Sequence, residues 1–267
     1  MLPVNPLRSR LARGEVAFGF GVRLARVAEV AAVASSCQFD WLFLDLEHSP
    51  MSVEAAAAIS VAALGAGLAP LARVPPGDFG VAARLLDAGA WGILMPHIDT
   101  AEQAAAAVHA LSFPPVGARS VSYSLPQLAF ASMRGGEAAR HFDQQALLVP
   151  MIESARGVAN AEGIAAVPGV DALFVGANDL SADLGVPGEV GHEAVTAACQ
   201  RVVQACQARG KWPGLGGVYA EELLRGHVGR GMRLVLGATD MALMLDAARD
   251  RSAMLRRCGA AALRPGA

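Results

Sequence analysis

Residues 41–48 read WLFLDLEH, a short apolar run that ends in a group of ionisable side chains. Continuous apolar runs of this length are typical of parallel strands that are buried on both faces. Similar runs occur elsewhere along the chain, and Ala-rich segments with helical periodicity lie between them. We therefore predict strands at 16–22, 41–45, 68–74, 92–96, 146–152, 172–176, 212–216 and 233–237.

This alternation of strands and helices predicts an α/β protein of the (β/α)8, or TIM barrel, class. We expect one barrel domain over residues 1–257 and a flexible tail over residues 258–267. A doubly wound open sheet is the alternative, but the turn at Gly19-Phe20-Gly21 lacks the third glycine of a dinucleotide-binding loop. The predicted helices occupy 53–64, 80–88, 101–111, 156–166, 193–208, 220–227 and 241–255.

The segment 112–145 does not fit a minimal barrel, because it is too long for a simple connection between a helix and a strand. Insertions of this kind usually cover an active site or contact another subunit. The sequence does not choose between these two roles.

The composition indicates a protein with a large apolar core and little net charge. Hydrophobic residues make up 54% of the chain, and the formal net charge is −2 at pH 7. This balance gives no electrostatic reason to expect nucleic acid or a membrane as a partner. The four cysteines have neither CxxC nor Cys/His spacing, so we expect reduced thiols rather than disulfides or a zinc site. With no signal-like or membrane-spanning run, we predict a cytoplasmic protein.

Two acidic residues, Glu153 and Asp179, each follow a predicted strand. The carboxyl ends of barrel strands meet at one face, so both carboxylates are expected to point into the same place. Carboxylate oxygens suit a hard divalent cation such as Mg²⁺ or Mn²⁺. The alternative is that each acid caps the helix that follows it. Gly176 and Ala177 are small enough to let backbone N–H groups approach an anion nearby.

Other ionisable residues end, or directly follow, other predicted strands. Arg73 closes an apolar run and is a natural partner for a carboxylate or enolate oxygen, although a structural ion pair with Asp45 or Glu47 is equally compatible. His48 stands beside these acids and is a candidate general base, although a histidine in a loop is more often a surface residue. Asp87 lies late in a predicted helix, and two roles are open for it: orienting a histidine, of its own chain or of a neighbouring subunit, or hydrogen bonding at the helix end.

Several motifs, taken together and in order, resemble a known family, the HpcH/HpaI aldolases. These are metal-dependent class II pyruvate aldolases, and they include 4-hydroxy-2-oxoheptanedioate and 2-dehydro-3-deoxyglucarate aldolases. The similarity extends from Asn5 to about Leu255. The motifs that carry it are FDWLFLDLEHSP at 39–50, ARVP at 72–75, LDAG at 86–89, the stretches 96–102 and 114–120, IES at 152–154 and VGANDLS at 175–181.

The resemblance implies a phosphoenolpyruvate/pyruvate-binding TIM barrel in which Glu153 and Asp179 hold a divalent cation, Mg²⁺, Mn²⁺ or Co²⁺. It also implies a homohexamer, a trimer of dimers, in which the last helix is exchanged between neighbours and Asp87 reaches a neighbouring subunit's site. We therefore predict four catalytic residues, His48, Arg73, Asp45 and Asp87. The predicted substrate-binding residues are Arg73, Gly176, Ala177, Asn178 and Asp179.

Three places depart from the family pattern. Leu46 replaces a common Gly, Met151 stands where many members have Gln, and Ala177-Asn178 replaces a common Pro-Ser or Pro-Ala pair. Because these positions surround the expected pyruvate pocket and metal, they leave the identity of the substrate open.

The predicted function is that of a carbon–carbon lyase, which forms or cleaves 4-hydroxy-2-oxo acids with pyruvate or hydroxypyruvate as nucleophile and an aldehyde as acceptor. This chemistry needs an electron sink, which is either a Schiff-base lysine or a metal. Lys211 is the only lysine, and it precedes its predicted strand, at the wrong end of a barrel. A metal-dependent oxo-acid decarboxylase or CoA-ester lyase, and a binding barrel without catalytic activity, are the alternatives.

Overall fold

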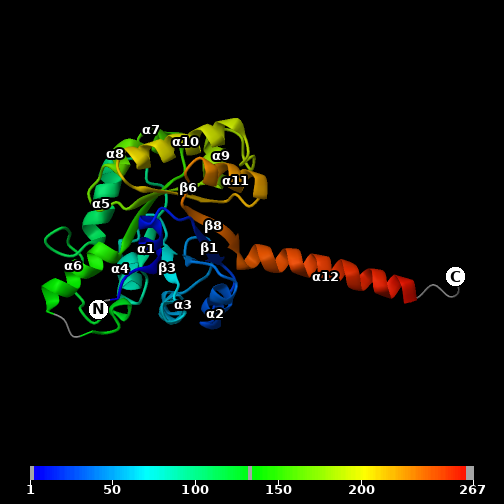
Figure 1. Cartoon of the computed structure of the whole chain (residues 1–267), viewed down its shortest axis with the longest axis horizontal. Coiled ribbons are helices and arrows are strands. Elements are labelled where there is room, and N and C mark those ends of the chain that lie inside the picture. Colours follow the sequence, from blue (N-terminus) through cyan, green and yellow to red (C-terminus); the bar gives the residue numbers. More distant parts are fainter. Residues whose placement is uncertain (1–2, 132–133, 263–267) are drawn as a thin grey trace.

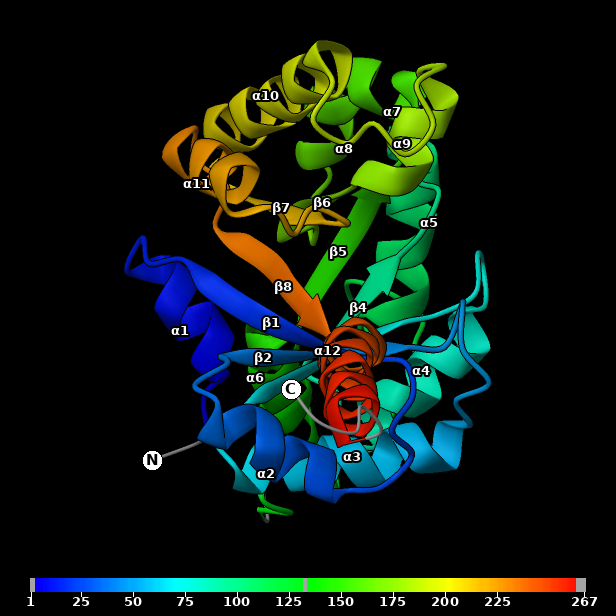
Figure 2. The same ribbon diagram turned by 90° about the vertical axis from the view of Figure 1, so that its right-hand side faces the viewer.

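The computed structural model describes residues 3–131 and 134–262, and its centre is a closed barrel of eight parallel strands. The strands are paired in chain order, and β1 pairs with β8 to close the barrel (Figures 1 and 2). The predicted (β/α)8 barrel is therefore confirmed. The strands are β1 (Ala17–Val22), β2 (Trp41–Asp45), β3 (Ala69–Arg73), β4 (Gly92–Met95), β5 (Leu147–Ile152), β6 (Ala172–Gly176), β7 (Trp212–Gly216) and β8 (Leu234–Thr239).

Helices surround this barrel, and their boundaries agree with the sequence pattern where a clear cap is present. Thr100 and Gln103 form the capping box that starts α5, and Ser52 caps α3. The predicted helix 156–166 is wrong as one unit, because the chain forms two short helices that meet at Asn160. The helices are α1 (Pro6–Ala12), α2 (Glu29–Ser36), α3 (Val53–Gly65), α4 (Phe79–Asp87), α5 (Ala101–Leu111), the 3₁₀ helix η1 (Pro126–Leu128), α6 (Gly135–Gln145), α7 (Ala155–Ala159), α8 (Ala161–Ala165), α9 (Ala177–Asp183), α10 (Glu193–Ala208), α11 (Glu221–Gly229) and α12 (Asp240–Ala262).

Aromatic side chains fill the inside of the barrel. The rings of Trp41, Phe43 and Phe174 lie 6.3 to 6.4 Å apart, and all three are buried. They fit because neighbouring strands carry glycine: a Cβ atom on Gly19 would overlap the indole of Trp41. The barrel is therefore a packed core whose open space lies only towards the ends of the strands.

The amino-terminal end of the barrel is closed by structural contacts. Arg8 of α1 forms an ion pair with Asp171 at 2.7 Å and donates to the carbonyl of Ala146, and both partners directly precede strands. Lys211 directly precedes β7, and its Nζ donates to the carbonyl of Val170. The only lysine therefore lies at this end, as its position in the sequence predicted.

The insertion 112–145 also packs towards the amino-terminal end. The Gln127 side chain donates to the carbonyl of Leu86, in the last turn of α4, and to that of Ala90, between α4 and β4. Arg119 pairs with Asp87 at 2.6 Å at the same end of α4. Of the two roles left open for this segment, a cover over the carboxyl ends of the strands of its own chain is therefore excluded for its described residues.

The last helix, α12, leaves the barrel after β8 and projects away from it (Figure 1). It continues to Ala262, so the predicted end at residue 255 is wrong. Of the predicted flexible tail, residues 258–262 are helical, and residues 263–267 lie outside the described residues. None of the described helices is both long enough and apolar enough to cross a membrane.

Candidate active site

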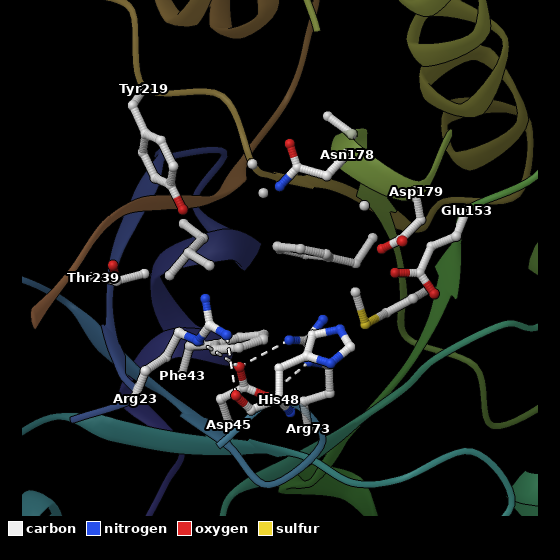
Figure 3. Close-up of a pocket in the computed structure, with 17 residues that line it drawn as sticks. Arg23, Phe43, Asp45, His48, Arg73, Glu153, Asn178, Asp179, Tyr219 and Thr239 are labelled. Atoms are coloured by element: carbon white, nitrogen blue, oxygen red, sulfur yellow. Dashed lines mark hydrogen bonds and ion pairs between the residues drawn. The ribbon is translucent and has the colours of Figure 1, made fainter. Parts of the chain in front are cut away.

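A cavity of about 220 Å³ opens at the carboxyl ends of the strands. The residues around it come from β2, β3, β5, β6, β7 and β8 and from the residues that follow β1, β2, β5, β6 and β7 (Figure 3). All of the predicted site residues except Asp87 line this cavity. Strand ends that are distant in the sequence are therefore brought together as the barrel pattern predicts.

Two carboxylates share one side of the cavity, with little to neutralise them. Glu153 is 4% exposed; its Oε2 accepts a hydrogen bond from the backbone N–H of His97 at 2.9 Å, and its Oε1 has no hydrogen-bond partner. Asp179, in the first turn of α9, points towards the same space (Figure 3). Burial raises the pKa of Glu153, and the charge of Asp179 acts in the same direction, against the His97 N–H and Arg73.

These residues fit a divalent cation. A buried carboxylate oxygen without a donor, next to a second carboxylate, is stabilised by a positive charge placed between them. No group of three or more His, Cys, Asp and Glu ligands occurs in the described part of the chain. A cation held by Glu153 and Asp179 would therefore keep coordination positions for water and a substrate, as Mg²⁺ sites commonly do.

Gly176 is required by this arrangement for a reason that the sequence pattern did not reveal. A Cβ atom at this position would overlap Glu153 Oε1 and lie 2.8 Å from Glu153 Cγ. The glycine therefore provides the space that the Glu153 carboxylate occupies. Its neighbours Ala177 and Asn178 also line the cavity, at the start of α9.

Arg73 also lines the cavity and is held by two acids. Its Nε and Nη2 donate to Oδ1 and Oδ2 of Asp45 at 3.1 and 2.9 Å, and its Nε lies 3.2 Å from Glu47 Oε2. Burial alone would raise the pKa of Asp45, but the hydrogen bonds and charge of Arg73 outweigh it, and the pKa lies below its ordinary value. The structural ion pair, one of the two sequence-based hypotheses for Arg73, is therefore present, and Arg73 also lines the cavity. A contact with a carboxylate or enolate oxygen of a substrate stays a prediction.

Two histidines stand at the rim of the cavity. His48 is half-exposed, its backbone N–H donates to Asp45 Oδ1 at 3.1 Å, and its Nε2 lies 3.7 Å from Glu47 Oε2. His97 has a φ of +55° and its Nδ1 lies 3.5 Å from Glu153 Oε2. His48 therefore faces both the cavity and solvent, and the backbone N–H of His97 holds Glu153.

Asp87 does not reach this cavity within one chain. It ends α4, near the amino-terminal end of the barrel, and its Oδ1 accepts from the buried Arg119 at 2.6 Å. The hydrogen bond near the helix end, which the sequence left as the alternative role, is therefore present. A contribution of Asp87 to a neighbouring subunit's site stays a prediction.

Two cavity residues, Arg23 and Tyr219, were not predicted from the sequence. Arg23 directly follows β1, so the signal that identified Arg73, a charged residue at the end of a buried strand, was present. Tyr219 lies in the turn between β7 and α11, where no pattern distinguishes it from a surface residue.

Comparison with known proteins identifies a family and several similar chains. The family model described as "HpcH/HpaI aldolase/citrate lyase" matches residues 24–247. A 4-hydroxy-4-methyl-2-oxoglutarate aldolase of Chaetomium globosum is 41% identical over 82% of this chain and 82% of its own. A hydroxypyruvate/pyruvate aldolase of Pseudomonas aeruginosa is 35% identical over 93% of this chain and 92% of its own.

Solved structures lead to the same family. An HpcH/HpaI aldolase from Desulfitobacterium hafniense superposes with a TM-score of 0.89 at 26% identity, covering 95% of this chain and 97% of that one. An HpcH/HpaI aldolase/citrate lyase family protein from Burkholderia cenocepacia superposes with a TM-score of 0.83 at 34% identity, covering 94% of this chain and 99% of that one. The names of these relatives confirm the predicted enzyme class, a carbon–carbon lyase. The chain therefore belongs to the HpcH/HpaI aldolase/citrate lyase family.

Proposed function

We propose that the protein catalyses the reversible aldol addition of pyruvate or hydroxypyruvate to a carbonyl acceptor, forming or cleaving 4-hydroxy-2-oxo acids through an enolate. The observation that carries the proposal is the buried, unpaired Oε1 of Glu153 beside Asp179, in one cavity with Arg73. The two carboxylates support a cation site, and Arg73 adds a guanidinium to the same cavity. The relatives named above as aldolases support the same chemistry.

Glu153 and Asp179 are the proposed ligands of a divalent cation, with Mg²⁺, Mn²⁺ and Co²⁺ all compatible with oxygen ligands. When bound, such a cation supplies a Lewis acid that withdraws charge from a keto group and acidifies the neighbouring C–H bond.

The remaining residues bind the donor substrate and move its proton. The backbone N–H groups around Ala177 to Asp179 bind the carboxylate, and the guanidinium of Arg73 stabilises the negative oxygen of the enolate. His48 takes the methyl proton, directly or through water, and returns it during cleavage. Asp45 fixes the orientation of Arg73 and accepts the backbone N–H of His48, so it acts by positioning.

The experiment that tests the proposal is deuterium exchange into the methyl group of pyruvate, followed by proton NMR with and without EDTA. We expect exchange in the presence of Mn²⁺ or Mg²⁺ and its loss after chelation, and we expect pyruvate release from 4-hydroxy-2-oxo acids to behave in the same way. Exchange that survives complete removal of metal would contradict the proposed cation site.

Treatment with borohydride and pyruvate distinguishes a Schiff-base mechanism in the same preparation. The Nζ of Lys211 donates to Val170 at the far end of the barrel, so no covalent adduct is expected by mass spectrometry. Oxaloacetate and CoA esters are tested as substrates in the same preparation, so that the decarboxylase and CoA-ester lyase alternatives are measured directly.

We also propose that the chain forms a homo-oligomer, a hexamer built as a trimer of dimers. The projecting α12 exposes Leu243, Met244, Leu245 and Leu255, each more than 40% exposed. Leu243 and Met244 also line an apolar groove beside α2 and β1. Such a surface on a projecting helix is typical of a subunit interface.

Light scattering during size-exclusion chromatography tests the assembly. We expect a mass of six chains for the wild type and smaller species for Met244→Asp, because the substitution places a charge on the apolar groove. Arg225→Gln, at an exposed ion pair on α11, serves as the matched surface control. A wild-type protein that elutes as a monomer would contradict the proposal.

A further inference from the structure

The structure brings a second arginine, Arg23, into the cavity, away from the two carboxylates. Arg23 directly follows β1, and Tyr219 lines the cavity beside it. Figure 3 shows Arg23 and Tyr219 on one side and Glu153 and Asp179 on the other. None of the roles assigned above to the donor substrate, the cation or the proton uses Arg23.

Much of the hydrogen-bonding capacity of Arg23 is unused by the protein. Its Nη2 donates to the carbonyl of His48 at 3.1 Å, and its Nε lies 3.1 Å from Asp45 Oδ2 without the geometry of a hydrogen bond. Within residues 3–131 and 134–262, no acceptor for its Nη1 is found. Arg73, in contrast, already bonds both oxygens of Asp45. Arg23 therefore keeps donors available for a ligand.

The backbone that carries Arg23 is fixed in place. The Asp240 carboxylate accepts hydrogen bonds from the backbone N–H groups of Arg23, Leu24 and Ala25 at 2.9, 3.0 and 2.8 Å. Arg26 adds a hydrogen bond to the carbonyl of Arg23 at 3.0 Å. A guanidinium held in this way loses little conformational entropy when it binds a ligand. Its side chain is still 39% exposed, so a ligand can reach it from solvent.

The chemistry of this position selects a carboxylate. The planar guanidinium matches a carboxylate in geometry and charge, and the Tyr219 hydroxyl adds a second donor on the same side. The proposed function places the carboxylate of pyruvate across the cavity, at the backbone of residues 177–179. A carboxylate beside Arg23 therefore belongs to the second substrate, the acceptor.

We propose that Arg23, assisted by Tyr219, binds the carboxylate of the acceptor, so that the protein selects short oxo acids over neutral aldehydes. This inference rests on the proposed function. With glyoxylate as acceptor, the methyl carbon of pyruvate forms a bond to the aldehyde carbon, the methyl proton passes to the base, and the aldehyde oxygen receives a proton. No group leaves, and the product, 4-hydroxy-2-oxoglutarate, carries two carboxylates.

The test compares glyoxylate with acetaldehyde, which has a methyl group in place of the carboxylate. With pyruvate as donor, we expect the wild type to have the higher kcat/KM for glyoxylate. In Arg23→Leu, the ratio of the two kcat/KM values is expected to fall by roughly 10- to 100-fold, mainly through KM for glyoxylate. Any general loss of activity, for example through Asp45 or His48, cancels in this ratio. Tyr219→Phe is expected to lower the ratio by a smaller factor.

Arg84→Leu is the control, because Arg84 carries the same charge, is exposed on α4 and does not line the cavity. It is expected to keep the wild-type ratio. A ratio in Arg23→Leu within about threefold of the wild type, or a wild type that prefers acetaldehyde, would overturn the inference. Deuterium exchange of pyruvate needs no acceptor, so exchange with an unchanged ratio overturns only this inference, whereas no exchange overturns the proposed function and the inference with it.

Discussion

Glu153→Gln is expected to lower the rate of deuterium exchange into pyruvate by at least about 10³-fold, because Lewis-acid activation contributes several kcal/mol to proton abstraction. Gln keeps the shape of the side chain and its hydrogen bond from the His97 N–H, but it removes the negative charge from the buried Oε1 position. We expect the affinity for Mn²⁺, measured by calorimetry, to fall together with the rate.

The stability of Glu153→Gln provides the internal check. Because burial raises the pKa of Glu153 and Asp179 adds to the repulsion, removing this charge is expected to leave the metal-free protein at least as stable as the wild type in thermal unfolding. Glu54→Gln, on the exposed first turn of α3, is the matched control and is expected to behave as the wild type. Tight binding of Mn²⁺ by Glu153→Gln, with a rate within about tenfold of the wild type, would exclude Glu153 as a ligand.

Arg73→Ala is expected to lower the rates of deuterium exchange and of aldol turnover by roughly 100-fold. One charge-stabilising donor contributes about 3 kcal/mol to such a reaction. The substitution also leaves Asp45, which is 0% exposed, with only the partly exposed Arg23 as a counter-charge. We therefore expect a lower stability as well, by a few kcal/mol, on the order of the cost of an unpaired buried charge.

Arg73→Lys separates these two effects, since it keeps the charge but loses the two parallel hydrogen bonds to Asp45. It is expected to recover much of the stability and less of the rate. Affinity for Mn²⁺ is expected to survive in both variants, because Arg73 is not a ligand. Arg84→Ala, exposed on α4, is the control for loss of an arginine. Near wild-type aldol turnover in Arg73→Ala would show that the enolate is stabilised elsewhere.

The strands of this fold are predictable because burial on both faces produces apolar runs, and each of the eight predicted runs overlaps a strand. Helices are predictable where side chains cap them. Helix α2 begins at Glu29, after Ala28, which provides no side-chain cap, and α9 begins directly after β6, so neither start has a signal of its own. Helix α12 continues past the predicted end at residue 255, through Gly259 and to Ala262.

The candidate site was largely predictable because barrel topology gathers the strand ends. Glu153, Asp179, Arg73, Asp45 and His48 are all there. The sequence could not provide the directions in which side chains point. It did not show that a Cβ at Gly176 would overlap Glu153, or that Asp87 faces Arg119. Such facts depend on contacts between segments that are far apart in the chain, and residue types alone do not specify them.

One carboxylate, that of Asp240, has an implication for protein engineering. It is the first residue of α12, and it also secures the loop that carries Arg23. A change to the start of the projecting helix therefore also changes the support of Arg23, the residue proposed to bind the acceptor. A shortened or fused version of the enzyme needs Asp240 in its present backbone position. Without it, the proposed preference for acceptors with a carboxylate is expected to weaken even though no cavity residue has been exchanged.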